Sequence, residues 1–200
     1  MAHHLQSLFI LFLLAINHLL PAQTTQFNHG FLLKLTKDLE SHQYTAQLLI
    51  GTPQLPAKVV VHLSGQSIWL CPSSSPSRTL INHNSLQCLM AKSDDQKSAS
   101  AICDVYQQNP ITGETSVGVV VEDTVTVDVV GPISTVDKFL FSCSPGSLLS
   151  GLVTGANGVL GFGRSKIAFQ SQIVNNFDFP REFTVCLSSS KGFIIPGTGH

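Results

Sequence analysis

The amino-acid sequence predicts an all-β, turn-rich fold. Charged residues make up only 12% of the 200 residues, whereas hydrophobic residues make up 43%. The chain is rich in Ser, Thr, Val, Gly and Pro, the residues typical of strands and tight turns. Its apolar residues fall into short runs, several of them with a period of two. The length suffices for one ordinary domain or a small pair.

The first predicted strands lie at residues 31–35, 44–50 and 58–63. The third is apolar and β-branched, as expected of a buried strand. Gly51, Pro53 and Pro56 mark the turn between the second and the third strand, because glycine and proline favour the backbone angles of turns.

Residues 71–109 show little periodicity, and we expect long surface loops held by disulfides there. Regular structure resumes at residues 116–130, where valines alternate with other residues. A period of two predicts strands with one buried face. Residues 138–143 form a further short strand in this prediction.

The stretch 158–164 is apolar and interrupted by glycines. It lacks the Gly-Lys-Ser/Thr of a phosphate loop, so Gly161 and Gly163 more plausibly allow two backbones to approach closely. Residues 167–175 are the best helix candidate, with Ile167 and Ile173 on one face. The last predicted strands are 183–187 and 192–195.

The first 22 residues have a different character. Leu8–Ile16 is an apolar run too short to span a bilayer, and the small residue Ala22 is a plausible cleavage position. We therefore expect a signal peptide at 1–22, a mature domain at 23–200 and secretion to the extracellular space. A buried strand or an uncleaved anchor is the alternative, since no Lys or Arg precedes the run.

The formal net charge is −1, with no basic cluster and no acidic tail. This composition argues against nucleic acid as a partner and, after removal of the signal, against a membrane. The chain has no Cys-x-x-Cys and no Cys/His pair at zinc spacing, so neither a metal site nor a cofactor is predicted.

Several motifs resemble the N-terminal lobe of the pepsin-like aspartic protease family. In that family an Asp-Thr/Ser-Gly triplet carries the catalytic Asp, and a Trp follows seven residues after it. Here His62 stands at the Asp position, Leu63 and Ser64 complete the triplet, Gly65 follows it, and Trp69 lies at the expected distance. The opening hairpin at 44–54 and the apolar glycine segment at 159–164 match in the same order.

A narrower group matches more closely: the plant xylanase inhibitors, basic 7S globulins and extracellular dermal glycoproteins. The likeness runs from about residue 31 to the end, and its further motifs lie at 139–143, 163–167, 171–172 and 183–190. This resemblance implies a pepsin-like β-barrel: a single N-terminal lobe of a normally two-lobed fold, with the C-terminal lobe absent. Members of the group have mostly lost protease activity, and some inhibit microbial glycoside hydrolases.

Aspartic proteolysis needs two carboxylates that share a proton and activate a water. An imidazole at position 62 cannot serve as one of them, and in the family the other comes from the second lobe. The family's flap tyrosine is expected near Pro110, a position that neither Tyr44 nor Tyr106 fits. The resemblance therefore predicts that the chain is not an enzyme and has no catalytic residues.

The other chemically suggestive residues have plainer interpretations. His62 is expected to be the relic of a decayed site rather than a new base. Ser64 and Ser67 lack the Gly-x-Ser-x-Gly elbow of a serine nucleophile, and Trp69 is expected in the core. The remaining candidates are expected in exposed strands or turns, namely Asp104, Asp123 and Asp128.

Five cysteines remain after signal removal, an odd number that leaves at least one thiol without an internal partner. We expect Cys71–Cys143 and Cys88–Cys103 as disulfides. Cys186 is then free or available to a second lobe, although a bridge from Cys186 to Cys71 or Cys143 stays open.

The leading functional hypothesis is a secreted, non-catalytic aspartic-protease homologue. It would be a protein-binding or glycoside-hydrolase-inhibitor-like plant defence protein, or a truncated form of one. The first alternative is an aspartic endopeptidase, against which His62 argues. The second is a storage or structural extracellular protein.

Overall fold

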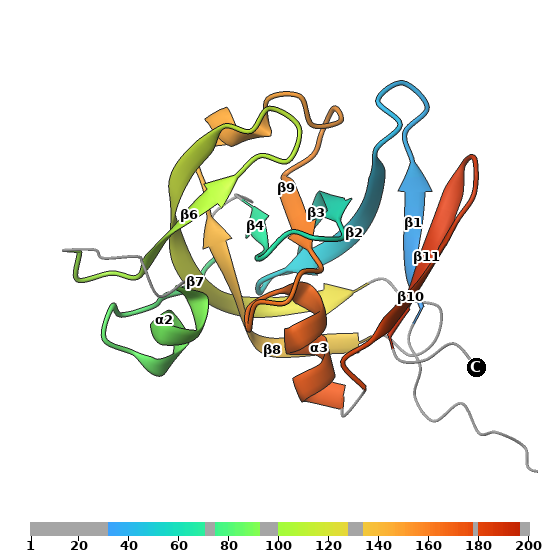
Figure 1. The fold of residues 1–200 in the computed structure, drawn as a ribbon. Coiled ribbons are helices and arrows are strands. Elements are labelled where there is room, and N and C mark those ends of the chain that lie inside the picture. The colour runs from blue at the N-terminus through green and yellow to red at the C-terminus, as the bar shows by residue number, and fades with distance from the viewer. Residues whose placement is uncertain (1–31, 71–74, 93–99, 128–133, 178–179, 197–200) are drawn as a thin grey trace, which may run out of the picture.

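Six strands form a closed β-barrel at the centre of the structure (Figure 1). The computed structural model describes residues 32–70, 75–92, 100–127, 134–177 and 180–196. In order around the barrel, the strands are β2 (Tyr44–Ile50), β3 (Leu55–His62), β9 (Gly158–Gly161), β4 (Trp69–Leu70), β8 (Ser134–Cys143) and β7 (Thr115–Val127). Pairing between β2 and β7 closes the barrel.

Two of these pairings are parallel and join segments far apart in the sequence. Strand β3 pairs with β9, so that Val61 lies opposite Leu160 and His62 opposite Gly161. Strand β4 pairs with β8 at Trp69 and Ser142. The glycine segment is thereby placed beside the His62 strand.

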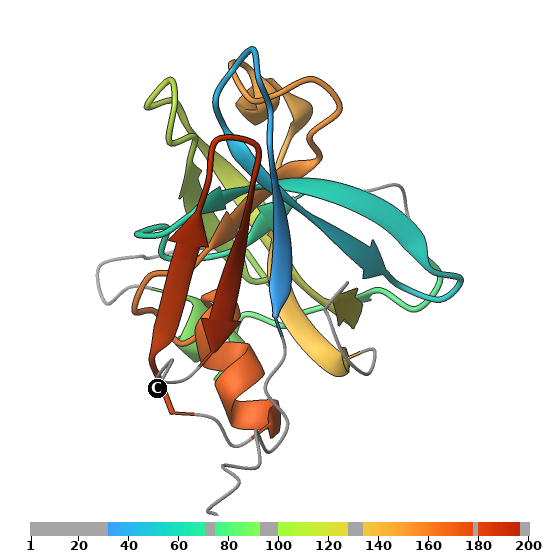
Figure 2. The same ribbon diagram turned by 90° about the vertical axis from the view of Figure 1, so that its right-hand side faces the viewer.

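A second sheet extends from the barrel at its N-terminal strand. Strand β1 (Leu33–Lys37) pairs with β2 on one side and with β11 (Lys191–Pro196) on the other, and β11 pairs with β10 (Phe183–Leu187). Figure 2 shows the β10–β11 hairpin standing beside β1 and α3 (Phe169–Phe177). Among the described strands, β10 pairs only with β11, which leaves its other side as a sheet edge.

Helix α3 covers one end of the barrel through an amphipathic face. Phe169 and Ile173 are buried, while Asn175 and Asn176 are exposed. The buried Gln172 amide binds both the backbone N–H and the carbonyl of Leu140 in β8, each at 2.8 Å. Helix and strand are therefore held by polar as well as apolar contacts.

The segment 71–109 is more ordered than expected. It contains β5 (Thr79–Leu80), the helix α2 (Leu86–Ala91) and β6 (Asp104–Gln108), and both strands pair with β7. The prediction of loops alone was wrong, because short elements do not produce a readable period. A 3-10 turn at Gly146–Leu149 was also not predicted.

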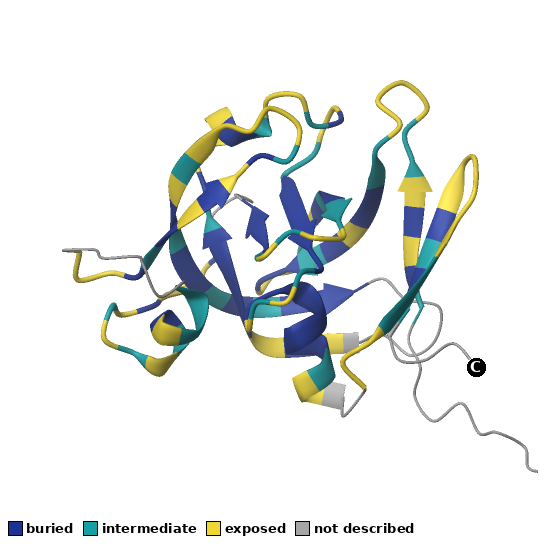
Figure 3. Cartoon of the chain, viewed as in Figure 1, coloured by how far each residue is buried: buried dark blue, intermediate teal, exposed yellow. Residues whose placement is uncertain are grey.

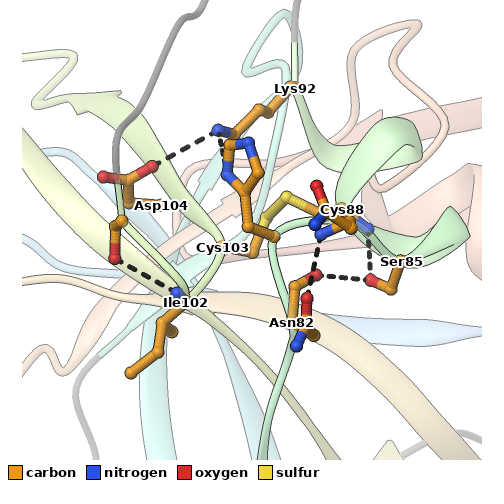
Figure 4. Close-up of polar contacts among 10 residues, drawn as sticks. Asn82, Ser85, Cys88, Lys92, Ile102, Cys103 and Asp104 are labelled. Atoms are coloured by element: carbon orange, nitrogen blue, oxygen red, sulfur yellow. Dashed lines mark hydrogen bonds and ion pairs between the residues drawn. A yellow bond between two sulfur atoms is a disulfide. The ribbon is translucent and has the colours of Figure 1, made fainter.

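Three local interactions hold α2 in place (Figure 4). The Ser85 hydroxyl accepts a hydrogen bond from the N–H of Cys88 and so caps the helix. Cys88 forms a disulfide with Cys103, which confirms the predicted pair. At the other end, the Lys92 ammonium lies 3.4 Å from the Asp104 carboxylate.

The main hydrophobic core fills the barrel (Figure 3). It owes its shape to strands whose buried residues alternate with outward-facing ones, as in β1, where Leu33 and Leu35 are buried and Lys34 is exposed. Phe139, Phe162 and Phe169 meet within it in tilted ring pairs. Burial of large apolar side chains is the dominant stabilising term of such a fold.

The other element boundaries agree with the sequence to within a few residues. Strands β2 and β10 match the prediction at both ends, and α3 lies two residues later than expected. The signal peptide, Cys71 and Asp128 lie outside the described residues. In the described ranges, no helix has both the length and the apolar character that crossing a bilayer would require.

Candidate functional site

The candidate site begins where β3 ends at His62. The His62 carbonyl accepts hydrogen bonds from the N–H groups of Gly65 and Phe162, at 3.1 and 3.0 Å. The N–H of Gly163 donates to the carbonyl of Gly65 at 2.7 Å. These bonds fold the chain back after His62 and tie the turn to the glycine segment.

The glycines of this segment allow the close approach. A Cβ on Gly161 would collide with the backbone oxygens of Ser67 and Gly65, and a Cβ on Gly158 would collide with the backbone of Trp69 and Leu70. The predicted packing role of the glycine segment is thus confirmed.

The His62 side chain meets one hydroxyl. Nε2 of His62 lies 3.1 Å from the Ser64 hydroxyl oxygen. Burial lowers the pKa of His62 below its ordinary value of 6.5, because an imidazolium is solvated less well there than in water. The imidazole is therefore mainly neutral near neutral pH.

A hollow of about 340 Å³ opens beside His62, and we call it the His62 hollow. No aspartate or glutamate belongs to its described lining, so no carboxylate pair can share a proton there. Its lining consists of His62, Ser64, Gly65, Gln66, Ser67, Trp69, Tyr106, Gln107, Gln108, Pro110 and Val159.

The hairpin formed by β6 and β7 supplies one wall of this hollow. The Ser67 hydroxyl donates to Oε1 of Gln107 at 2.6 Å and so links the hairpin to the turn after His62. Tyr106 lines the hollow, and so does Pro110, near which the flap tyrosine was expected. The turn residues Asn109, Pro110 and Gly113 were the signal that could have identified the hairpin.

Trp69 is 3% exposed and packs with Val60, Leu148 and Val159, which confirms its place in the core. Only part of it borders the hollow. The Ser67 hydroxyl is bonded to Gln107, and the Ser64 hydroxyl lies beside the His62 imidazole. The described lining of the hollow adds no carboxylate that could complete a nucleophilic triad with Ser64 and His62.

The expectation for Asp123 was wrong. Its side chain is fully buried and lies 3.6 Å from the Arg78 guanidinium, and it accepts hydrogen bonds from Ser77 Oγ and from the N–H of Thr124. Asp104 is half-buried and pairs with Lys92. Both carboxylates thus have structural partners, and neither lines the His62 hollow.

Two cysteine expectations remain predictions. Cys143 ends β8, but its expected partner Cys71 lies outside the described residues. Cys186 is exposed on β10 and forms no disulfide with any described residue. Within the described ranges, no three His, Cys, Asp or Glu side chains gather in a way that could hold a metal ion.

Comparison with known proteins relates this architecture to a family. Residues 44–198 match the family model described as xylanase inhibitor N-terminal. A protein of Nicotiana benthamiana named "Probable aspartic proteinase GIP2" is 33% identical over 191 residues, which cover 85% of this chain and 44% of the relative. The chain therefore spans less than half the length of the curated relatives it matches.

Solved structures agree. Basic 7S globulin from soybean superposes with a TM-score of 0.77 at 32% identity, over 86% of this chain and 50% of that one. The aspartic proteinase from Irpex lacteus superposes with a TM-score of 0.56 at 15% identity, over 86% of this chain and 49% of that one, a likeness of fold alone. The chain therefore belongs to the xylanase-inhibitor N-terminal family and has the fold of one pepsin-like lobe.

Proposed function

We propose that this chain belongs to a secreted, non-catalytic aspartic-protease homologue that acts by binding another protein. A microbial glycoside hydrolase is the candidate class of partner, because the matched family carries the description of a xylanase inhibitor. The proposal concerns one lobe, since the chain matches about half of its relatives.

The chemistry of the His62 hollow is the observation that carries the proposal. Aspartic proteolysis depends on two carboxylates at close range, one of which must hold a proton while the other is charged. At the position that corresponds to the first of them, a mainly neutral imidazole makes a hydrogen bond to Ser64. This arrangement supports loss of proteolysis.

One relative is named a probable aspartic proteinase, so endopeptidase activity is the alternative to be tested. The purified chain should be assayed on unfolded casein at about pH 3 to 5, where aspartic dyads work, with and without pepstatin. We expect no cleavage above a mock preparation, with pepsin as positive control. Cleavage that pepstatin abolishes would establish the alternative.

The binding side of the proposal has its own assay. A fungal xylanase should be measured with increasing amounts of the chain, and we expect either inhibition or a complex detectable by gel filtration. Absence of both for several microbial glycoside hydrolases would remove this partner class while leaving the protease result intact.

Secretion is part of the proposal and rests on residues 1–22 of the sequence. The Cys88–Cys103 disulfide supports it, because disulfides persist mainly in oxidising compartments. Protein recovered outside the producing cell should begin within a few residues of Gln23 on N-terminal sequencing. A soluble intracellular product that retains Met1 would contradict secretion.

A further inference from the structure

A second hollow, of about 770 Å³, lies beside the turn that follows His62, and we call it the Arg181 hollow. Ser64 and Gln66 line both hollows, but the other walls differ. They come from the residues after β9, from Gln170 at the start of α3 and from Arg181 and its neighbours before and within β10. Nothing in the proposed loss of proteolysis uses this hollow.

The Arg181 guanidinium is held at one nitrogen. Nη2 donates to the Ser171 hydroxyl at 2.6 Å and to the backbone carbonyls of Arg164 and Ser165 at 3.1 and 3.4 Å. The Ser171 hydroxyl in turn donates to the Ser165 carbonyl at 2.6 Å, so it is itself fixed. The other nitrogens of Arg181, Nε and Nη1, form no hydrogen bond or ion pair within the described part of the chain.

A guanidinium held in this way is suited to bind an anion. Its N–H groups form a rigid planar fork that matches the two oxygens of a carboxylate. Because one nitrogen is already fixed, little conformational freedom is lost when the remaining groups bind a ligand.

Gln170 provides a second, independent indication of a ligand. It lines the same hollow and is only 8% exposed, yet its amide nitrogen Nε2 has no hydrogen-bond partner among the described residues. Burial of an amide donor without an acceptor is unfavourable. Because Nε2 is itself shielded from solvent, the amide has to turn toward the hollow to meet an acceptor there, and such an acceptor would remove this penalty.

The charge of the lining favours an anion. Two guanidiniums, of Arg164 and Arg181, and one carboxylate, of Glu182, border the hollow. Within the described ranges Glu182 forms no ion pair with either arginine. Both cations are therefore available to an incoming group.

The remaining walls select a carboxylate on an apolar stem. Leu63 is 45% exposed, and Phe162 and Phe183 border the hollow beside it. Such walls suit the methylene groups of a glutamate better than a bare inorganic anion. Phe183 is also the first residue of β10, whose outer side is a sheet edge in the described structure. Edges of this kind accept extended peptides through backbone hydrogen bonds.

We propose that the Arg181 hollow binds an acidic side chain from an extended segment of the partner protein, while that segment pairs with β10. The proposal rests on the proposed function in one respect, namely that the occupant is a protein. It does not depend on whether the His62 site is active.

The probe is a terminally blocked heptapeptide of alternating Val and Thr with one central Glu, and the matched peptide carries Gln instead. Affinities should be measured by isothermal titration calorimetry on the purified chain. We expect the Glu peptide to bind at least about tenfold more tightly, the usual effect of a charge-assisted hydrogen bond. Equal affinities would overturn the proposal.

Three variants locate the binding. Arg181→Gln and Arg164→Gln should each weaken the Glu peptide about tenfold and leave the Gln peptide unchanged. Lys166→Gln is the matched control, because it removes the same charge close by without lining the hollow, and it should change neither affinity. If Arg181→Gln unfolds the chain, Arg164→Gln still tests the proposal. The Arg164 side chain makes no hydrogen bond or ion pair in the described structure, so its replacement should not affect folding.

Competition identifies the ligand. Glutarate should displace the Glu peptide, and inorganic phosphate at the same concentration should not. Displacement by phosphate alone, or an unchanged Glu-peptide affinity in Arg164→Gln, would refute a carboxylate site. The casein assay of the proposed function is separate, so failure of peptide binding and appearance of proteolysis are distinguishable results.

Discussion

The hydroxyl of Ser64 lies 3.1 Å from Nε2 of His62, in the turn that follows β3. The described lining of the His62 hollow contains hydroxyl, amide, phenol and apolar side chains beside this imidazole, and no aspartate or glutamate. In the described residues the imidazole therefore has a hydroxyl and not a carboxylate as its neighbour.

Restoring one carboxylate should not restore proteolysis. In the His62→Asp variant the new carboxylate would face no second carboxylate in the described lining. The two carboxylates that must share one proton in aspartic proteolysis would therefore still not be present together. We expect no pepstatin-sensitive cleavage of casein by this variant. His62→Asn is the matched control, and activity in the Asp variant alone would show that a second carboxylate reaches the site.

The half-buried imidazole of His62 should make the fold sensitive to acid. The pKa of His62 is lowered in the folded state by burial, so below its ordinary value of 6.5 the unfolded chain takes up a proton more readily than the folded chain. Stability is thus present above that pH and is lost as the pH falls toward the folded pKa.

Urea unfolding at about pH 7.5 and pH 5 tests this, in the wild type and in His62→Gln. The wild type should lose stability relative to the variant at the lower pH. An NMR titration that gave His62 a pKa of 6.5 or more would contradict the direction of the shift.

Gly161→Ala should be strongly destabilising. The added methyl group would meet the backbone oxygens of Ser67 and Gly65, which cannot move without breaking the turn after His62. We expect a loss of about 3 kcal/mol, the upper part of the range for overpacking. Gly146→Ala is the control, since its methyl group would meet nothing within 4 Å, and it should unfold like the wild type.

Asp123→Asn should lower the free energy of unfolding by about 3 kcal/mol or more, because it removes the carboxylate of a buried ion pair with Arg78. Asp137→Asn is the comparison. Asp137 is exposed and accepts one hydrogen bond from Thr124, so its change should stay within about 0.5 kcal/mol. Equal effects in thermal unfolding would show that burial of Asp123 carries no energetic weight.

Mass spectrometry of a non-reduced digest checks the cysteines. After alkylation of free thiols we expect the Cys88–Cys103 bridge, a Cys71–Cys143 bridge and an alkylated Cys186. Removing the first bridge with Cys88→Ser and Cys103→Ser should cost about 3 kcal/mol, as the chain-entropy model gives for a loop of this length. Cys186 found in a bridge to Cys71 or Cys143 would refute the assignment.

The sequence carried clear information on the strands with a strict period. Strand β1 shows this well, because Leu33 and Leu35 are buried on either side of the exposed Lys34. Strand β7 departs from the period, since Val117 is 46% exposed whereas Val120 and Thr126, of the opposite parity, are buried. The burial of Asp123 in β7 therefore depends on tertiary contacts. Its partner Arg78 was not predicted either, since it stands in a segment without a period.

The candidate site was less accessible to prediction. No local pattern predicted that His62 and Gly161 lie opposite each other, because a parallel pair joins segments far apart in the sequence. No sequence pattern pointed to Gln170 or Arg181 as residues of a binding site. The hollow that they line lies between a turn, the start of a helix and a strand, and only tertiary packing brings these together. The place of Tyr106 in the lining was not predicted, because the hairpin around it was taken as a loop.

The parallel pairing of β3 with β9 has a consequence for biosynthesis. Val61 and Leu160 are neighbours in the barrel, so the strand at Val61 cannot find its partner until nearly a hundred further residues have been made. At ribosomal rates of about 5 to 20 residues per second, this takes roughly 5 to 20 seconds. During that interval one edge of the apolar strand β3 lacks its final partner, and an unpaired edge of this kind is a site where nascent chains can pair with one another.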